Sequence, residues 1–496
     1  MMSMKKLAKD TVIYGLSSIF GKFLNWCLVP LYTRQLGSTA EYGMVTNMYS
    51  WTALILVILT FGMETGFFRF ANKSDKNPIT VYSTSVLFIG ALSLLFAGSS
   101  ILLAPMLAAP LGYGNHTEYI FLLAIIVSID AFSAIPFAYL RYKNRPIRFA
   151  SIKMLFIILF IALNLFFLIF CPAIHKSHPE WISWFYRPDY GVGYILISNL
   201  IATAVMMLAL IPELLGFKYV LDKSLLKELV KYSFPLLILG IAGIFNQVAD
   251  KILFPFLIPD EKTAMEQLGV YGANFKIAVV MVMFTQAFRF AYEPFVFSKQ
   301  KGADSKKLYA DAMKYFIIAS CLIYLGIMFY MDLLKYIIAP DYFEGLRVVP
   351  IVMIGQFLFG VYFNLSFWYK LTDETKYGAY FSVLACVLTI LLNVLFVPKY
   401  GYIACAWASL ISYLIITIMS YFIGQKHYPV QYDLKRIGLY TLITLGLYAA
   451  YMLVDLQSIP LNMAYRTLLI SVFIYYMIKN DLPLDQIPLV NKLVKQ

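Results

Sequence analysis

Several strongly polar side chains lie inside stretches that are otherwise apolar enough to cross a membrane. The clearest example is Ile244–Pro259, IFNQVADKILFPFLIP, which contains Asn246, Gln247, Asp250 and Lys251. A charge at bilayer depth costs roughly 2.5–3.5 kcal/mol on insertion scales, so it normally faces a bundle interior or a water-filled cavity. Polar groups in this place therefore indicate a path for a hydrophilic ligand or an ion.

Comparable residues recur at a few other apolar positions. The further candidates for contacting a ligand are Lys22, Asn25, Asn274, Lys276, Gln286 and Arg289. The acids that could carry a proton or an ion are Glu64, Asp130, Asp250 and Glu293, because a carboxylate in a low-dielectric setting binds protons more readily.

Spacing along a helix predicts which of these charges can pair. Asp250 and Lys251 are adjacent and diverge by about 100° around a helix, so we do not expect them to face each other. Arg289 and Glu293 are four residues apart, which favours a mutual salt bridge. Lys251 has no opposite charge three or four residues away, and neither does Lys22. This favours contact between both lysines and something that enters the bundle.

Neither a metal site nor a catalytic centre is indicated. The five cysteines are dispersed, and His175 and His178 alone are too few ligands for a metal. Gly21-Lys22 lacks the flanking residues of a phosphate-binding loop. The longest connection predicted outside the membrane, Pro172–Gly191, is too short for a catalytic domain, although a polymerase or ligase of lipid-linked glycan is the enzymatic alternative. We expect no enzyme, no metal and no cofactor, with transport driven by an ion gradient or the membrane potential.

Membrane-spanning helices must position these residues. The chain has 496 residues, of which 61% are hydrophobic and 14% charged, and its mean hydropathy is +0.74. A bilayer core of ~30 Å needs about 20 apolar residues per helix, and such runs recur throughout. We predict an all-α polytopic membrane protein with about fourteen transmembrane helices. The predicted spans are 11–33, 42–68, 79–104, 119–140, 149–171, 190–211, 232–258, 268–297, 315–338, 348–369, 377–397, 401–423, 437–455 and 461–478.

The distribution of positive charge predicts the orientation of the chain. Of the 40 Lys and Arg residues, 28 lie in or beside one set of alternate connections and 8 in the other set. This asymmetry follows the positive-inside rule and places both termini in the cytoplasm. The formal charge of +13 therefore reflects membrane topology and attraction to anionic lipid, and we expect no nucleic-acid partner.

An internal repeat predicts the domain organisation. Shifting the sequence by 229 residues superposes Lys22 on Lys251 and Glu64 on Glu293, and Tyr42-Gly43 on Tyr271-Gly272. Six spans separate the copies, so the two halves have the same orientation and form a parallel repeat. We predict six-helix lobes at 1–220 and 221–430, followed by an extra helix pair and cytoplasmic tail at 431–496. Spans 1, 2, 7 and 8 should then line a central cleft.

The connection PAIHKSHPEWISWFYRPDYG carries five aromatic residues, among them Trp181 and Trp184. Aromatic side chains of this kind gather at the membrane–water interface, which is the favoured interpretation. A surface that stacks against sugars is the alternative.

The chain resembles the polysaccharide transporter family of the multidrug/oligosaccharidyl-lipid/polysaccharide exporter superfamily. The similar features are the basic start KKLAKDTVIYGLSSIFGKFLNWCLVPLYTRQLGSTAEYGMV, the Arg-x-Leu-Gly-x-x-x-Tyr-Gly-like turn at Arg34–Gly43, the parallel repeat and the polar residues in spans 1, 2, 7 and 8.

The resemblance implies a flippase of the bacterial inner membrane. Its substrate would be an undecaprenyl-diphosphate-linked oligosaccharide for surface polysaccharide such as O-antigen, moved from the inner to the outer leaflet by alternating access. The cleft lysines and Arg289 would contact the diphosphate, and the amides the sugar hydroxyls. Partners would be membrane lipid and other polysaccharide-assembly proteins. The alternatives are a lipid II flippase and an ion-coupled exporter of drugs or metabolites.

Overall fold

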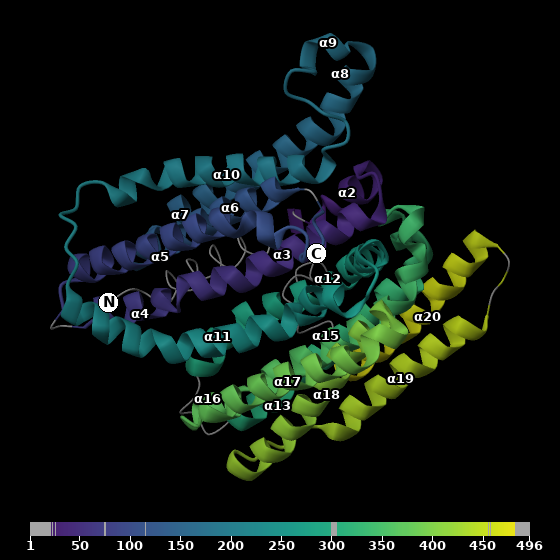
Figure 1. The fold of residues 1–496 in the computed structure, drawn as a ribbon. Helices are drawn as coiled ribbons and strands as arrows, with labels where there is room; N and C mark the ends of the chain where they lie inside the picture. Colours follow the sequence, from purple (N-terminus) through teal and green to yellow (C-terminus); the bar gives the residue numbers. More distant parts are fainter. Residues whose placement is uncertain are drawn as a thin grey trace, which may run out of the picture. The chain divides into compact units, whose positions relative to one another are not determined.

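The computed structural model describes residues 21, 23–24, 26–73, 76–114, 116–298, 305–454, 456 and 458–481, without the side chains of 291, 293–298, 305 and 459. Every regular element within these residues is a helix (Figure 1). In the same part of the chain, thirteen helical stretches are long and apolar enough to cross a membrane. The prediction of an all-α polytopic membrane protein is confirmed.

The helical stretches coincide with the predicted spans. Pro78–Leu107 contains the predicted span 79–104, and Pro460–Asn480 contains the last one, 461–478. The first predicted span, 11–33, lies largely outside the described residues, so the thirteen stretches correspond to the second through the fourteenth predicted spans.

Contacts divide the chain into two compact units, each built from three segments. The first unit contains Met1–Lys276, Ile338–Val348 and Tyr377–Ser412, and the second contains Ile277–Ile337, Val349–Lys376 and Tyr413–Gln496. The lobes at 1–220 and 221–430 and the pair at 431–496 follow the repeat in the sequence, and that division stays a prediction.

The first unit contains the helices of the N-terminal half, two later helices and parts of two others. Its helices are α2 (Val29–Gln35), α3 (Thr39–Thr60), α4 (Met63–Ala71), α5 (Pro78–Leu107), α6 (Thr117–Tyr142), α7 (Pro146–Leu165), the π-helix η1 (Phe166–Phe170), α8 (Cys171–Ser177), α9 (Pro179–Ile182), α10 (Gly191–Leu214), α11 (Lys223–Leu257), the 3-10 helix η3 (Pro340–Val348), α17 (Lys376–Tyr400), and the first parts of α12 (Glu261–Ser298) and α18 (Tyr402–His427).

One membrane span of this unit is broken into two helices. Phe61 ends α3 with a φ of 55° and Gly62 precedes α4 with a φ of 65°, so two consecutive residues are left-handed. A left-handed residue ends a helix because it turns the next carbonyl away from the helix axis. The break places Glu64 in the first turn of α4, where an acid is stabilised by the helix dipole.

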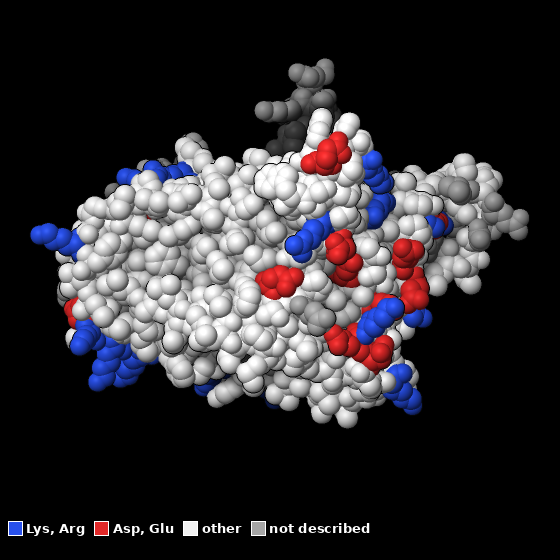
Figure 2. Space-filling view, turned by 45° about the horizontal axis from the view of Figure 1, so that its top comes forward, with Lys and Arg blue, Asp and Glu red and all other residues white. Residues whose placement is uncertain are grey.

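The first unit has a core inside and apolar side chains outside. Met63, Phe67 and Tyr82 are completely buried in one cluster between α4 and α5. On α5, Leu94 and Leu102 are 76% and 81% exposed. Figure 2 shows one face on which charged side chains gather in patches and leave a broad uncharged surface. Exposed apolar side chains of this kind are expected where lipid replaces water as the solvent.

The second unit contains the last pair of helices and the helices that hold it. They are α13 (Ser305–Phe329), α14 (Met331–Leu334), the 3-10 helix η2 (Lys335–Ile337), α15 (Val349–Leu365), α16 (Phe367–Leu371), α19 (Leu434–Leu453), α20 (Ile459–Asn480), and the remaining parts of α12 and α18. Phe316 and Phe329 of α13 pack in one buried cluster with Tyr440 of α19 and Phe473 of α20.

Ion pairs fix the helix pair α19–α20 to α13 at both ends. At one end, the Asp481 carboxylate lies 3.2 Å from Lys314 Nζ and 2.7 Å from Arg436 Nη1. At the other end, Arg466 Nη1 lies 2.6 Å from Asp332 Oδ2 and donates to the carbonyl of Phe329, the last residue of α13. The pair is therefore an integral part of the second unit.

Replacing Asp481 by asparagine is expected to lower the stability of the second unit by roughly 2–3 kcal/mol, the usual contribution of hydrogen bonds to a buried charge. Burial raises the pKa of Asp481, but hydrogen bonds from Tyr440, Arg436 and Lys314 outweigh burial, and the net pKa is below its ordinary value. The stabilisation is thus present above about pH 4 and is lost as the pH falls through the lowered pKa. Thermal unfolding of the purified protein between pH 3 and pH 7 checks this.

The pH profile distinguishes the contribution of the Asp481 ion pairs from destabilisation of the whole protein by acid. The difference in unfolding temperature between the wild type and Asp481→Asn should shrink as the pH falls. Asp189→Asn, which changes an exposed acid, should follow the wild type throughout. A constant difference across the whole range would contradict the assignment.

Candidate functional site

The polar stretch Asn246–Lys251 of α11 contains a buried ion pair. Lys251 Nζ lies 3.0 Å and 2.9 Å from the two carboxylate oxygens of Asp250, and Tyr271 OH donates to the same carboxylate at 2.6 Å. Asp250 is 3% exposed and Lys251 8% exposed. The prediction that these adjacent residues would not pair is wrong, because the flexible four-carbon stem of lysine can fold back around the helix.

Residues from other helices of the first unit surround this pair. The Lys251 ammonium lies 4.0 Å from the centroid of the Phe275 ring, a cation–π contact that further stabilises the charge. Asn47 of α3 donates to the Lys251 carbonyl at 2.8 Å and accepts from Tyr113 at 2.8 Å. The buried Cys405 of α18 is close enough to interact electrostatically with Asp250. Sequence reasoning missed these partners, because they lie 20 to 200 residues away.

Lys276 has an exposed side chain and lies beside the buried pair. Its backbone carbonyl accepts from Trp26 Nε1 at 2.8 Å, and its side chain has no hydrogen-bond or ion-pair partner among the described residues. Lys251 is near enough to repel it electrostatically. Lys276 lies in the middle of a membrane-spanning helix, so an accessible charge there indicates a hydrated cavity.

The three amides predicted in this region differ in their surroundings. Asn246 is buried and accepts from Thr389 Oγ1 of α17 at 2.8 Å. Gln247 is exposed and donates to the Gly243 carbonyl. Asn274 is completely buried and donates to the carbonyls of Val270 and Tyr342, so it holds η3 against α12. This buried position leaves Asn274 out of the site we propose, because no sugar can reach it in this conformation.

The other predicted cleft residues are in the second unit or outside the described part of the chain. Gln286 is half-buried, and Arg289 is exposed with its guanidinium 4.8 Å from the centroid of the Phe363 ring. Lys22, Asn25 and the side chain of Glu293 lie outside the described residues, and so does the predicted Arg289–Glu293 salt bridge.

Two acids predicted to bind ions have basic partners inside the first unit. The Glu64 carboxylate accepts from Arg141, which comes from the basic stretch Arg141–Arg148. Asp130 on α6 interacts electrostatically with Lys153 on α7. Neither pairing could be predicted from the sequence, because each joins two different helices. In the sequence, Arg141 is explained by the positive-inside rule alone.

Three glycines allow α3 and α12 to cross at backbone contact. A Cβ atom on Gly43 would lie 1.9 Å from the Met265 carbonyl oxygen, and one on Gly269 would lie 1.9 Å from the Thr39 carbonyl oxygen. A Cβ atom on Gly272 would lie 2.4 Å from the Thr46 hydroxyl. Small residues at such contacts let membrane helices approach closely.

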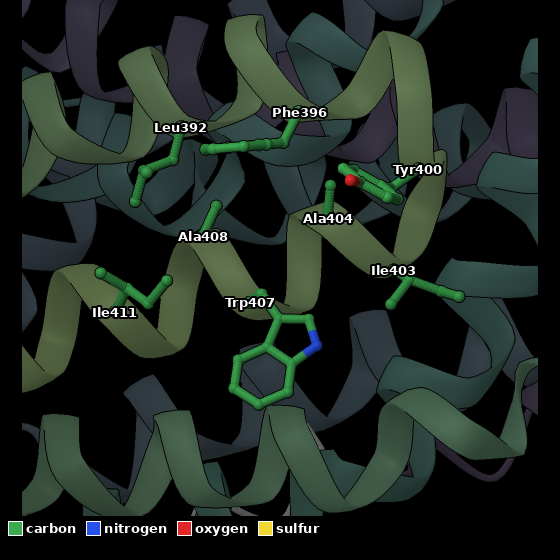
Figure 3. Close-up of a pocket in the computed structure, with 8 residues that line it drawn as sticks. All are labelled: Leu392, Phe396, Tyr400, Ile403, Ala404, Trp407, Ala408 and Ile411. Atoms are coloured by element: carbon green, nitrogen blue, oxygen red, sulfur yellow. The ribbon is translucent and has the colours of Figure 1, made fainter.

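A groove of about 370 Å³ between α17 and α18 has a different character (Figure 3). The residues that line it are Leu392, Phe396, Tyr400, Ile403, Ala404, Trp407, Ala408 and Ile411. The lining contains no charged side chain and several lipid-exposed ones. This groove suits hydrocarbon, whereas the surroundings of Lys276 suit a charged group.

Solved transporter structures share this fold. The lipid II flippase MurJ, in an inward closed conformation, has a TM-score of 0.74 and 16% identity, with 95% of this chain and 99% of that chain covered. An inward-facing multidrug resistance MATE family transporter has a TM-score of 0.64 and 12% identity, covering 87% and 99%. The MATE multidrug transporter DinF-BH has a TM-score of 0.59 and 16% identity, covering 86% and 96%.

The chain therefore has the fold of these transporters. The polysaccharide biosynthesis protein family model matches residues 7–291, more than half of the chain, and the chain belongs to this family. The MatE family model matches residues 262–395. No curated protein matches the sequence. The family assignment made from the sequence is confirmed.

Proposed function

We propose that this transporter is a flippase for an undecaprenyl-diphosphate-linked oligosaccharide. A diphosphate and a hydroxyl-rich glycan cannot cross ~30 Å of hydrocarbon without losing their hydration, whereas the polyprenyl chain belongs there. A hydrated cavity that carries positive charge and is open to lipid meets both needs. The observation that carries the proposal is the position of Lys276. Its side chain is exposed in a membrane span, has no ion-pair partner among the described residues and lies beside the Asp250–Lys251 pair.

In this proposal Lys276 contacts the diphosphate first. Lys251 contacts it after its ion pair with Asp250 has separated. Gln247, four residues before Lys251, is exposed, and its side-chain amide can form hydrogen bonds with sugar hydroxyls. Lys22 and Arg289 stay predicted contacts of the diphosphate. The protein would lie in the bacterial inner membrane with both termini in the cytoplasm, as the positive-inside pattern predicts. An ion gradient or the membrane potential would drive transport.

Lys276→Gln is expected to abolish export of the glycan in a strain that depends on this protein, with the amount of protein unchanged. The substitution keeps an unbranched polar side chain and removes the charge that would pair with the diphosphate. Surface glycan and protein level are measured together by immunoblotting. Lys262→Gln, which neutralises a lysine with an 83% exposed side chain near the start of α12, is the control and should export normally. Normal export by Lys276→Gln would contradict the proposed role of this charge.

Two other substrates are distinguished by one measurement. The polyprenyl-diphosphate pool is extracted after depletion of the protein and analysed by mass spectrometry. Accumulation of a glycolipid with a longer sugar chain supports the proposal. Accumulation of lipid II favours the activity named for the MurJ structure, a lipid II flippase. An unchanged pool favours an ion-coupled exporter, which the MatE match over residues 262–395 supports.

A further inference from the structure

The segment Cys171–Tyr190, here called the paddle, extends beyond the ends of α7 and α10. The helical stretch Pro146–Ser177 contains 32 residues. At about 1.5 Å per residue it is longer than the ~30 Å hydrocarbon core, so its last turns reach past it. Figure 1 shows α8 and α9 beyond the ends of α7 and α10 and turned aside from the axes of these helices.

Aromatic stacking holds the paddle against α10. The Tyr194 ring stacks on Phe167 at 4.9 Å and on Tyr186 at 5.2 Å between centroids. Tyr194 OH also accepts from the Arg187 N–H at 2.7 Å. Because Tyr194 joins η1, the paddle and α10, the orientation of the paddle is fixed by the fold.

The paddle presents two tryptophans on its surface. Trp181 is 64% exposed and Trp184 is 83% exposed. Apolar side chains are also exposed at the end of the membrane span, where Ile169 is 42% exposed and Phe170 59% exposed. Exposed apolar side chains thus occur both in the last turns of the span and in the paddle.

Three polar groups near the tryptophans are satisfied from within the paddle. Trp184 Nε1 donates to the Trp181 carbonyl at 3.1 Å. Ser177 Oγ donates to the Ala173 carbonyl at 3.2 Å, and Ser183 Oγ donates to the Pro179 carbonyl. These three paired donors can enter a low-dielectric region without the penalty of an unsatisfied group.

The charges of the paddle lie beside this surface and cancel. Lys176 and Arg187 balance Glu180 and Asp189, with the histidines neutral. The His178 ring stacks on Trp181 at 4.5 Å between centroids. A neutral segment that exposes both aromatic and polar side chains matches the head-group region of a bilayer, where the rings of Trp meet both lipid and water.

We propose that the paddle is a membrane-surface element that inserts Trp181 and Trp184 into the lipid head-group region beside the α7–α10 hairpin. The paddle lies at the end of α7 opposite the basic stretch Arg141–Arg148. The positive-inside pattern predicts that Arg141–Arg148 is cytoplasmic, so the paddle is assigned to the extracytoplasmic leaflet. The inserted rings anchor this hairpin at a fixed depth. The proposal is independent of the substrate that the protein carries.

Spin labels in the full-length protein test the depth of an aromatic position and of a charged position of the paddle. Cys27 and Cys386, the two native cysteines that are not buried, are replaced first, by serine and alanine. A nitroxide is then attached at Trp184→Cys or, as the matched control, at Glu180→Cys, in phosphatidylethanolamine–phosphatidylglycerol vesicles. We expect position 184 to collide several-fold more with oxygen than with a water-soluble nickel chelate, and position 180 to show the reverse. Equal exposure of both positions to the chelate would overturn the proposal.

A second measurement uses the native side chains. The fluorescence lost in a Trp181→Phe/Trp184→Phe double variant gives the signal of these two residues. Brominated phospholipid should quench that signal in the wild type. A signal that bromolipid leaves unchanged, but that a lipid-free oligosaccharide alters, would overturn the proposal in favour of a sugar-stacking surface.

Discussion

Gly43→Ala is expected to cause a large loss of both stability and transport. The new methyl group would lie 1.9 Å from the Met265 carbonyl oxygen, well inside van der Waals contact. The obstacle is backbone in a helix, so no rotation of a side chain relieves it. Overpacking of this kind typically costs about 1–3 kcal/mol, and separating two whole helices places this variant at the upper end. Thermal unfolding is measured on the purified variant, and glycan export is measured in a strain that depends on it.

Gly98→Ala is the matched control for this experiment. A Cβ atom on Gly98 of α5 meets nothing within 4 Å. Alanine is favoured over glycine in a helix by about 1 kcal/mol, so this variant should be as stable as the wild type or more so. If Gly43→Ala unfolds and transports like Gly98→Ala, the close crossing of α3 and α12 is not required.

Asp250→Asn is expected to destabilise the first unit more than any other single charge change. It leaves the Lys251 ammonium, 8% exposed, without its counter-ion. Breaking a buried pair on one side typically costs about 3–5 kcal/mol, because an uncompensated buried charge remains. The unfolding temperature of the purified protein should fall accordingly, while Asp189→Asn, at an exposed acid, should leave it unchanged.

The double variant Asp250→Asn/Lys251→Met separates folding from transport. Replacing a buried pair by neutral or apolar groups is often neutral for stability, so the double variant should recover most of what the single variant loses. It should nevertheless fail to export glycan, because the second cation of the proposed site is gone. Full export by the double variant would show that the pair is structural only.

The spans could be predicted from the sequence because each is a local property of about 20 residues. The polar positions Asn246–Lys251 were found for the same reason, since a charge in an apolar run is visible without knowing its neighbours. The partners of these residues could not be found. Tyr271 and Asn47 meet the pair only after α3, α11 and α12 have packed, and helical spacing led to the wrong prediction for Asp250 and Lys251 because it ignores the reach of lysine.

The sequence motif at Gly43 shows the same limit. The turn Arg34–Gly43 contributed to the resemblance, and the repeat superposed Gly43 on Gly272. Both patterns marked the glycines without explaining them. The explanation is tertiary, because both lie where α3 meets α12 and a side chain at Gly43 would strike the backbone of α12.

The carboxylate of Asp250 also sets an upper limit on how tightly the proposed site can hold its cargo. Any anion that approaches Lys251 meets a counter-ion already in place, at 2.9 Å and fixed to the same helix. Capture by Lys251 is then an exchange of one negative partner for another, and the free energy gained is only the difference between them. The return of the resident carboxylate assists departure. A site of this kind favours rapid turnover over high affinity, as a carrier that must release its load requires.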